Sequence, residues 1–311
     1  MKRVMVTGGA GFIGSHLVDR LVTQGYDVIV LDDLSSGSLD NLAQAPFITF
    51  IDRKVEDLPS VASKLGTIDL VYHLAALISG HDSLLEPEIY LKANVNGVLK
   101  IIEFARQANV GRIVFSSSST VYGSTRVATR SETDVPSPIT VYALSKLAGE
   151  RLLAMYSAMT HYTHISLRLF NVYGPRQNPA HPYANVTCKF AEAAASNSAI
   201  DLYGDGEQTR DFIYVDDVVD AFLAVATDAP EPVYNVGTGV ETSINTLLSR
   251  IERISGRRME RRIHEDWPND VRAVRANVDL IRRDIGFSPA VDLDRGLEKT
   301  IEFFKLAARR G

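Results

Sequence analysis

The chain has 311 residues, enough for two domains of ordinary size, and it is 45% hydrophobic and 23% charged, as globular proteins are. Its net charge of −5 at pH 7 argues against nucleic acid or a membrane surface as a partner, because both attract clustered positive charge. The single cysteine, Cys188, excludes a disulfide within the chain and a cysteine-rich metal site. The sequence has neither a signal peptide nor an apolar run of the ~20 residues that span a membrane, so we expect a cytoplasmic protein.

Residues 3–170 alternate β-branched runs with helical segments. The runs lie at 4–9, 27–33, 69–76, 112–119 and 164–174, and the helical segments between them include 12–24 and 90–109. Continuous apolar strands separated by helices are typical of a parallel sheet that is covered by helices on both faces. We therefore expect an α/β protein in which residues 1–170 form a doubly wound parallel sheet.

The pattern changes after Pro175. A loop at 175–182 precedes a helical stretch at 186–196, and a strand-like segment at 233–237 precedes a helix near 243–254. We expect residues 171–311 to form mainly a smaller C-terminal lobe, with a segment at about 210–237 returning to the first domain.

Three glycines follow the first expected strand and open the first expected helix. Gly8, Gly11 and Gly14 have the spacing of a dinucleotide-binding loop, which needs a tight turn and a close backbone approach to a pyrophosphate. Phe12 and Ile13 would then present the helix N–H groups to that pyrophosphate. The motif predicts a Rossmann domain over residues 1–170.

An acidic residue ends each of the next two expected strands. Asp32 follows Gly14 by 18 residues, where a carboxylate accepts hydrogen bonds from the adenosine ribose of NAD and repels the 2′-phosphate of NADP. Asp33 is the alternative for this role. Asp52 ends the third apolar run and either bonds the adenine amino group or is an ordinary turn aspartate. These positions favour NAD as the cofactor.

A tyrosine and a lysine lie four residues apart in the segment YALSK. Tyr142 and Lys146 therefore share one face of a helix. An ammonium group near a phenol favours the phenolate and makes the tyrosine a usable acid and base near neutral pH. The serine-rich run at 116–119 would supply hydroxyl groups at the carboxyl edge of the sheet, where doubly wound folds bind ligands.

Taken together, the motifs TGGAGFIG, HLAA, NVNG, SSSSTVYG, YALSK, RLFNVYGPRQNP and YGDGEQTRDFIYVDD resemble those of the extended short-chain dehydrogenase/reductase family, in its branch of nucleotide-sugar epimerases. The resemblance covers nearly the whole chain. It implies an NAD-dependent isomerase that inverts C4 of a UDP-hexose, N-acetylated or not, by passing through a 4-keto sugar. It also implies a substrate-binding function for the C-terminal lobe and a requirement for no metal.

The resemblance assigns roles to single residues. Tyr142 is the acid/base at the sugar 4-hydroxyl, Lys146 binds the nicotinamide ribose, and Ser118 hydrogen-bonds the same hydroxyl, with Ser117 as the alternative. Of the remaining positions, the resemblance assigns Ala75 and Asn94 to cofactor binding. It assigns Asn171, Arg210 and Val274 to substrate binding.

The resemblance makes Asn171 and Arg210 the residues that hold the diphosphate of the substrate. Val274 stands at the sugar site, where it either leaves room for an N-acetyl group or only packs the lobe. The helix that follows Tyr142 and the segment 94–107 resemble the pair of helices that forms a homodimer interface in this family.

Some positions depart from the family pattern or narrow the reaction. Ser119 and Thr120 stand where related 4,6-dehydratases carry acidic residues, which disfavours elimination of water. Trp267 replaces an arginine that often binds the diphosphate, and Arg272 or Arg275 is the candidate to compensate. The alternatives to a 4-epimerase are an NAD-dependent nucleotide-sugar oxidoreductase, a dehydratase or a uronate epimerase of the same family.

Overall fold

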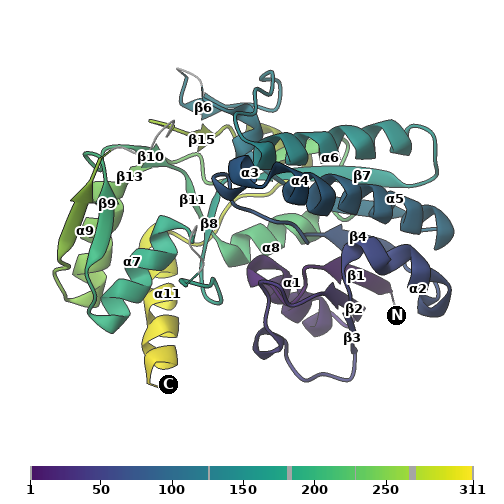
Figure 1. The fold of residues 1–311 in the computed structure, drawn as a ribbon, viewed down its shortest axis with the longest axis horizontal. Coiled ribbons are helices and arrows are strands. Elements are labelled where there is room, and N and C mark those ends of the chain that lie inside the picture. Colours follow the sequence, from purple (N-terminus) through teal and green to yellow (C-terminus); the bar gives the residue numbers. More distant parts are fainter. Residues whose placement is uncertain (1, 125–126, 181–183, 228, 266–270, 310–311) are drawn as a thin grey trace. The chain divides into compact units, whose positions relative to one another are not determined.

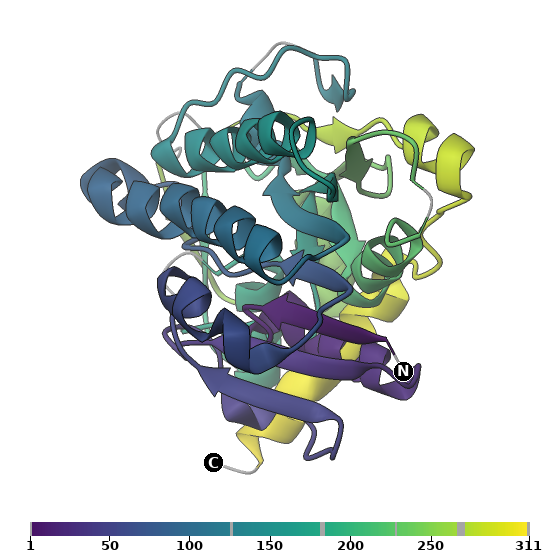
Figure 2. The same ribbon diagram turned by 90° about the vertical axis from the view of Figure 1, so that its right-hand side faces the viewer.

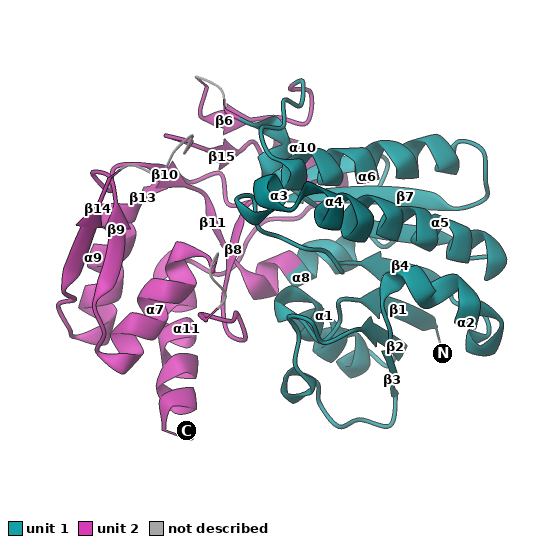
Figure 3. Cartoon of the chain, viewed as in Figure 1, with its two compact units in different colours: residues 1–123, 135–169, 219–234 teal, residues 124–134, 170–218, 235–311 magenta. Residues whose placement is uncertain are grey.

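The computed structural model describes residues 2–124, 127–180, 184–227, 229–265 and 271–309 (Figure 1). The chain divides into two compact units (Figure 3). Unit 1 comprises residues 1–123, 135–169 and 219–234, and unit 2 comprises residues 124–134, 170–218 and 235–311.

Unit 1 is built on a seven-stranded sheet with the order β12-β7-β5-β4-β1-β2-β3. The strands are β1 (Arg3–Thr7), β2 (Asp27–Asp32), β3 (Ile48–Asp52), β4 (Leu70–His73), β5 (Arg112–Ser118), β7 (Thr163–Leu169) and β12 (Val233–Val236). Neighbouring strands from β7 through β3 pair in parallel. The order reverses direction at β1, and the predicted doubly wound α/β fold is confirmed.

Helices cover both faces of this sheet. One face carries α2 (Leu58–Leu65), α5 (Gly97–Gln107) and α6 (Val141–Ser157), and Figures 1 and 2 show α5 and α6 running side by side. The other face carries α1 (Phe12–Thr23) and α8 (Val215–Ala224). Arg20 of α1 forms an ion pair with Asp220 of α8 at 2.5 Å. The shorter elements are η1 (Leu39–Asn41), η2 (Val55–Asp57), α3 (Asp82–Leu85), α4 (Pro87–Tyr90), the π-helix η3 (Leu91–Asn96) and η4 (Ser119–Tyr122).

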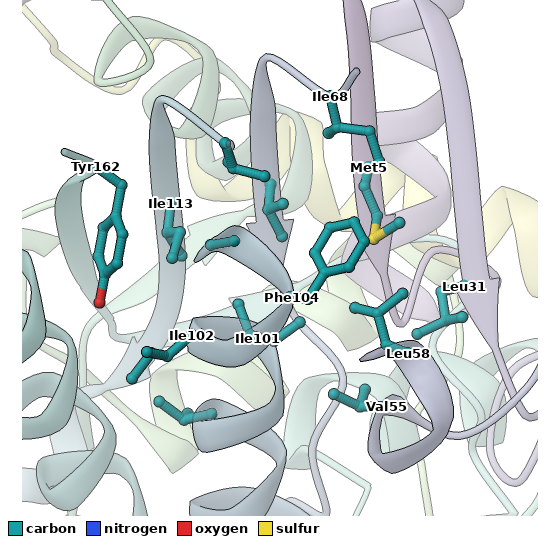
Figure 4. Close-up of a cluster of buried hydrophobic side chains, with 14 of the residues drawn as sticks. Met5, Leu31, Val55, Leu58, Ile68, Ile101, Ile102, Phe104, Ile113 and Tyr162 are labelled. Atoms are coloured by element: carbon teal, nitrogen blue, oxygen red, sulfur yellow. The ribbon is translucent and has the colours of Figure 1, made fainter. Parts of the chain in front are cut away.

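An extensive apolar cluster fills the space between the sheet and the helices α2 and α5 (Figure 4). Alternate residues of the strands, such as Met5 and Ile113, meet Ile101 and Phe104 of α5, and all four are fully buried. Burial of side chains this large stabilises the fold by about 1.5–3 kcal/mol each. The cluster fixes the sheet under the helices, and the sheet edge above it carries the candidate site.

The described residues of unit 2 form three larger helices and several short strand pairs. The helices are α7 (Val186–Ser196), α9 (Ile244–Ser255) and α11 (Leu293–Ala308), which pack against one another, and the shorter α10 (Asp279–Ile285). The strand pairs are β8 (Asn171–Tyr173) with β11 (Phe212–Tyr214), β9 (Ile200–Tyr203) with β14 (Arg261–His264), β10 (Thr209–Arg210) with β13 (Thr242–Ser243), and β6 (Thr129–Arg130) with β15 (Arg275–Ala276). Side-chain caps at Asn185, Ser243 and Asp292 fix where α7, α9 and α11 begin.

Two segments that look continuous in the sequence are divided in the structure. The run 164–174 breaks at Phe170, where the backbone leaves the large sheet: Phe170 N–H bonds Val236 O, and Asn171 N–H bonds Asp211 O. The helical segment 90–109 contains the π-helix η3 before α5 begins. Among the residues described, no helix has the length and apolar character that a membrane crossing requires.

Candidate cofactor and catalytic site

The glycine-rich turn between β1 and α1 packs backbone against backbone. Gly8 has φ +69°, in the left-handed region, and a Cβ there would lie 2.7 Å from Ala75 N. A Cβ at Gly14 would overlap the carbonyl oxygen of Gly8. Gly11 is the N-cap residue of α1 and has no side chain that could accept a hydrogen bond from the first N–H groups of the helix, such as those of Phe12 and Ile13. An uncapped helix N-terminus behind a tight turn suits a pyrophosphate.

Asp32 lies at the carboxyl end of β2 and faces this turn. Its carboxylate accepts hydrogen bonds from Ala10 N and Leu34 N, both at 2.9 Å, and the residue is only 8% exposed. Burial raises its pKa above the ordinary aspartate value, and the two backbone bonds oppose that rise. The carboxylate is therefore held in a fixed direction beside the loop.

The other two candidate aspartates are placed differently. Asp33 accepts hydrogen bonds from the backbone N–H and the hydroxyl of Ser35, so its carboxylate is used in a local turn. Asp52 lies opposite Asp32 in the β2–β3 register and is exposed. The geometry supports Asp32 over Asp33 for a ribose diol.

Tyr142 and Lys146 lie in the first turns of α6, which begins where the Thr140 hydroxyl accepts a bond from Ala143 N. Lys146 is 3% exposed, and its Nζ donates to Ser116 O at 2.8 Å and lies 5.9 Å from the centroid of the Tyr142 ring. Burial lowers the pKa of Lys146 to about 7. Burial raises the pKa of Tyr142, and a hydrogen bond with Ser118 opposes that rise.

The structure separates the two candidate serines. Neighbouring residues of a strand point in opposite directions, and Ser117 and Ser118 do so at the end of β5. Ser117 Oγ donates to Glu150, whereas Ser118 interacts with Tyr142 and accepts from Thr120 N and Thr120 Oγ1. The arrangement favours Ser118 as the hydroxyl that acts with Tyr142.

Asn94 lies in the π-helix and is buried. Its amide donates to Leu77 O and Ser145 Oγ and accepts from Leu77 N, each at 2.9 Å. It therefore ties the segment after β4 to the helix that carries Tyr142. Ala75, in the same segment, donates its N–H to Thr7 Oγ1 at 3.3 Å and lies against Gly8.

Two buried features near the site are not predicted from the sequence. His73 bonds Thr7 Oγ1 at 2.8 Å and stacks on Phe115, and burial together with the charge of Lys146 lowers its pKa to about 3. Glu150 and Arg168 form a buried ion pair at 2.8 Å. The sequence hints at both features only by placing a polar residue inside an apolar run, as in VYHLAA and ISLRLF. Such a residue does not show which partner it binds.

Of the predicted substrate residues, Ser118 belongs to unit 1, and Asn171, Arg210 and Val274 belong to unit 2. Asn171 begins β8, and its N–H bonds Asp211 O, next to Arg210. Arg210 donates to Val271 O at 2.6 Å, and Thr209 bridges to Ala273, the neighbour of the partly buried Val274. The structure therefore brings these three positions into one part of unit 2.

Trp267, which replaces the family's arginine, lies outside the described residues. The two arginines expected to compensate for it both pair with acidic side chains. Arg272 pairs with Asp205 at 2.7 Å, and Arg275 pairs with Glu241 at 3.4 Å. Within the described ranges, no group of three His, Cys, Asp or Glu side chains is arranged to hold a metal ion.

Residues 4–237 match a family described as the NAD dependent epimerase/dehydratase family. A UDP-glucose 4-epimerase of Mycolicibacterium smegmatis is 39% identical over 310 residues, which cover 97% of this chain and 98% of that protein. The structure of UDP-glucose 4-epimerase from Thermotoga maritima with UDP-glucose has a TM-score of 0.94 at 36% identity, covering 98% of this chain and 99% of the other. A UDP-N-acetylglucosamine 4-epimerase from Methanobrevibacter ruminantium, in complex with UDP-N-acetylmuramic acid, has a TM-score of 0.93 at 34% identity with the same coverage.

The chain therefore belongs to the NAD dependent epimerase/dehydratase family, and the predicted family is confirmed. NAD is the cofactor of this family, and the residues present fit it. The uncapped start of α1 suits the pyrophosphate, and the buried carboxylate of Asp32 suits the adenosine ribose.

Proposed function

We propose that this protein is a nucleotide-sugar 4-epimerase, an isomerase that inverts C4 of a UDP-hexose with NAD recycled in every turnover. The observation that carries the proposal is the placement of Lys146, which is buried on α6 one helical turn after Tyr142 and donates to Ser116 O near the carboxyl end of β5, the strand that ends with Ser118. The 4-epimerases named above, which cover nearly the whole chain, support it.

Unit 1 in this proposal holds the cofactor. Asp32 binds the adenosine ribose, Lys146 the nicotinamide ribose, and the start of α1 the pyrophosphate. The other cofactor residues of the proposal are Gly8, Gly11, Phe12, Ile13, Gly14, Ala75 and Asn94, with Asp52 near the adenine. In unit 2, Asn171 and Arg210 bind the diphosphate of the substrate.

The chemistry that NAD supplies when bound is acceptance and return of the C4 hydride, together with a positively charged ring. Tyr142 removes the proton from the sugar 4-hydroxyl and later returns it, while Ser118 hydrogen-bonds the same oxygen. Because burial raises the pKa of Tyr142, the phenol needs positive charge nearby to act as a base at neutral pH. Lys146 supplies part of that charge when it is protonated.

Epimerisation is favoured over elimination of water by the two residues that come directly after Ser118. Thr120 uses its N–H and its hydroxyl to bond Ser118, and Ser119 is its neighbour in η4. Neither side chain is a carboxylic acid that can protonate a leaving hydroxyl at C6. For the sugar itself, Val274 has a short side chain, so we propose that an N-acetyl group is accepted.

The test is proton NMR of the purified protein mixed in turn with UDP-N-acetylglucosamine and UDP-glucose, without added cofactor. Appearance of the galacto anomeric signal with either sugar supports the proposal, and the ratio of the two rates decides the N-acetyl question. Stoichiometric growth of absorbance at 340 nm would instead identify an oxidoreductase. No conversion of either sugar, even with added NAD, would contradict the proposal and favour a uronate or another nucleotide sugar.

The acid/base assignment is tested by Tyr142→Phe, with Tyr156→Phe on the same helix as the matched control. We expect Y142F to retain NAD and lose epimerisation, because it lacks only the phenolic oxygen. Y156F should remain active, because Tyr156 packs against the apolar cluster of unit 1. Near-normal turnover by Y142F would show that another group carries the proton.

We further propose a homodimer. The short helices α3 and α4 expose Leu84, Leu85 and Ile89, each more than half exposed, and Met155 on the neighbouring α6 is 54% exposed. Large apolar side chains exposed on adjoining helices are typical of an interface. Sedimentation that shows only monomer at micromolar concentration would contradict the homodimer.

A cytoplasmic location of the protein stays a prediction.

A further inference from the structure

Four buried polar residues of unit 1 form one hydrogen-bonded group behind the catalytic residues. Ser117 comes from β5, Tyr122 from η4, Glu150 from α6 and Arg168 from β7. None is more than 3% exposed. The group therefore joins four different elements, and we call it the Glu150–Arg168 network.

The contacts of this network are mutually satisfying. Arg168 donates from Nε to Glu150 Oε1 at 3.0 Å and from a terminal nitrogen to Oε2 at 2.8 Å, a two-pronged ion pair. Ser117 Oγ also donates to Oε1. The remaining terminal nitrogen of Arg168 donates to the Tyr122 hydroxyl at 3.0 Å, and the guanidinium carbon lies 4.8 Å from the centroid of that ring.

Two members of the network are close neighbours of catalytic residues along the chain. Ser117 precedes Ser118, and Glu150 lies one helical turn after Lys146 on α6. Lys146 is itself bonded to the backbone of β5, through Nζ to Ser116 O. The network thus fixes the end of β5 against the helix that carries Tyr142 and Lys146.

Stability alone does not account for a buried ion pair at this place. Removing two charges from water costs several kcal/mol each, and well-packed apolar side chains of similar volume often stabilise a fold as well or better. Two apolar side chains between α6 and β7 would extend the core without that cost. Apolar contacts are not directional. A bidentate ion pair that also bonds a hydroxyl group at each end holds its four elements at fixed distances.

We propose that Glu150 and Arg168, with Ser117 and Tyr122, are positioning residues for the epimerase reaction: they set the placement of Ser118 relative to Tyr142 and Lys146 without touching substrate. This inference rests on the proposed roles of those three residues. A misplacement of about 1 Å at reacting groups can cost about 100-fold in rate, so the effect of losing the network is large enough to measure.

The test compares wild-type protein with two variants and one control. Glu150→Leu/Arg168→Met removes both charges together and keeps similar volumes, so that no unpaired charge is left buried. Ser117→Ala removes only the hydroxyl bond to Glu150. The control is Ser166→Ala, a fully buried serine of the neighbouring strand β7, whose hydroxyl has no partner among the described residues.

We expect the double variant to melt near the wild-type temperature and to retain its NAD, with kcat lowered about 10- to 100-fold and KM for the UDP-sugar unchanged. The S117A variant should lose kcat by a smaller factor, and S166A should lose none. The low-pH limb of the kcat profile should move to higher pH in the double variant, because the bond from Ser118 that lowers the pKa of Tyr142 is weakened. A purely structural ion pair would change the melting temperature and leave that limb in place.

The outcomes separate this inference from the proposed function. If wild-type protein epimerises neither sugar, the proposed function fails, and the positioning role fails with it. If wild-type protein is active and the folded, NAD-loaded double variant keeps its kcat and pH profile, only the positioning role is refuted. If the double variant does not fold, S117A decides: an unchanged kcat and an unchanged pH limb refute the role.

Discussion

Replacing Lys146, the lysine of the proposed catalytic site, should make the NAD-free protein more stable at neutral and mildly acidic pH. Lys146 is buried, and burial lowers its pKa from 10.5 to about 7, so the folded state binds this proton more weakly than the unfolded state does. At 1.36 kcal/mol for each pH unit, the difference corresponds to about 5 kcal/mol of destabilisation below pH 7. Lys146→Met removes this penalty.

The net gain is smaller, because the substitution leaves Ser116 O without the donor it has at 2.8 Å. An unsatisfied buried acceptor costs about 1–3 kcal/mol, so we expect K146M to be more stable than wild type by about 2–4 kcal/mol at pH 6. The folded pKa is the lower of the two, so the penalty is complete below about pH 7 and disappears as pH rises toward 10.5. The advantage of K146M should therefore shrink by about 3 kcal/mol between pH 6 and pH 9.

The assay is urea unfolding of NAD-free protein at pH 6, 7.5 and 9, followed by far-ultraviolet circular dichroism. Lys64→Met, at an exposed position of α2, is the matched control and should change stability little at any pH. The K146M variant should also be inactive, because it lacks the ammonium group that we propose for the reaction. The buried lysine would then serve activity while it lowers stability. A K146M protein that is less stable than wild type at pH 6, or an advantage that does not depend on pH, would refute the reasoning.

Three further outcomes are expected. Phe104→Ala should destabilise unit 1 by about 3–5 kcal/mol in thermal or urea unfolding, because the ring is fully buried under α5, whereas exposed Phe47→Ala should cost far less. Asp32→Ala should weaken NAD binding and narrow the preference for NAD over NADP in equilibrium titrations, and an unchanged preference would transfer the role to Asp33. Asp211→Ala should destabilise unit 2 by about 2–4 kcal/mol in the same unfolding assays, because its buried carboxylate accepts four hydrogen bonds that would lose their acceptor; a change below about 1 kcal/mol would contradict this.

The sequence determined the fold class and the family. Continuous β-branched runs separated by helices predicted the doubly wound sheet, because a strand buried on both faces must be apolar throughout. The glycines at 8, 11 and 14 predicted the turn before α1. Only a residue without a Cβ allows the backbone segments to approach as closely as they do at Gly8 and Gly14. These features are local in the chain, and local features are visible in a single sequence.

Only the tertiary structure decided how the site is assembled. Four consecutive serines are equivalent in the sequence, and Ser117 and Ser118 became distinct when Glu150, 33 residues away, met one of them. The pairing of Glu150 with Arg168 and of His73 with Thr7 likewise joins residues 18 and 66 positions apart. The break at Phe170 follows from a change of strand partner, not from any turn residue at that place. Hydrogen-bond partners and desolvation depend on which elements the core brings together, so no short stretch of sequence contains them.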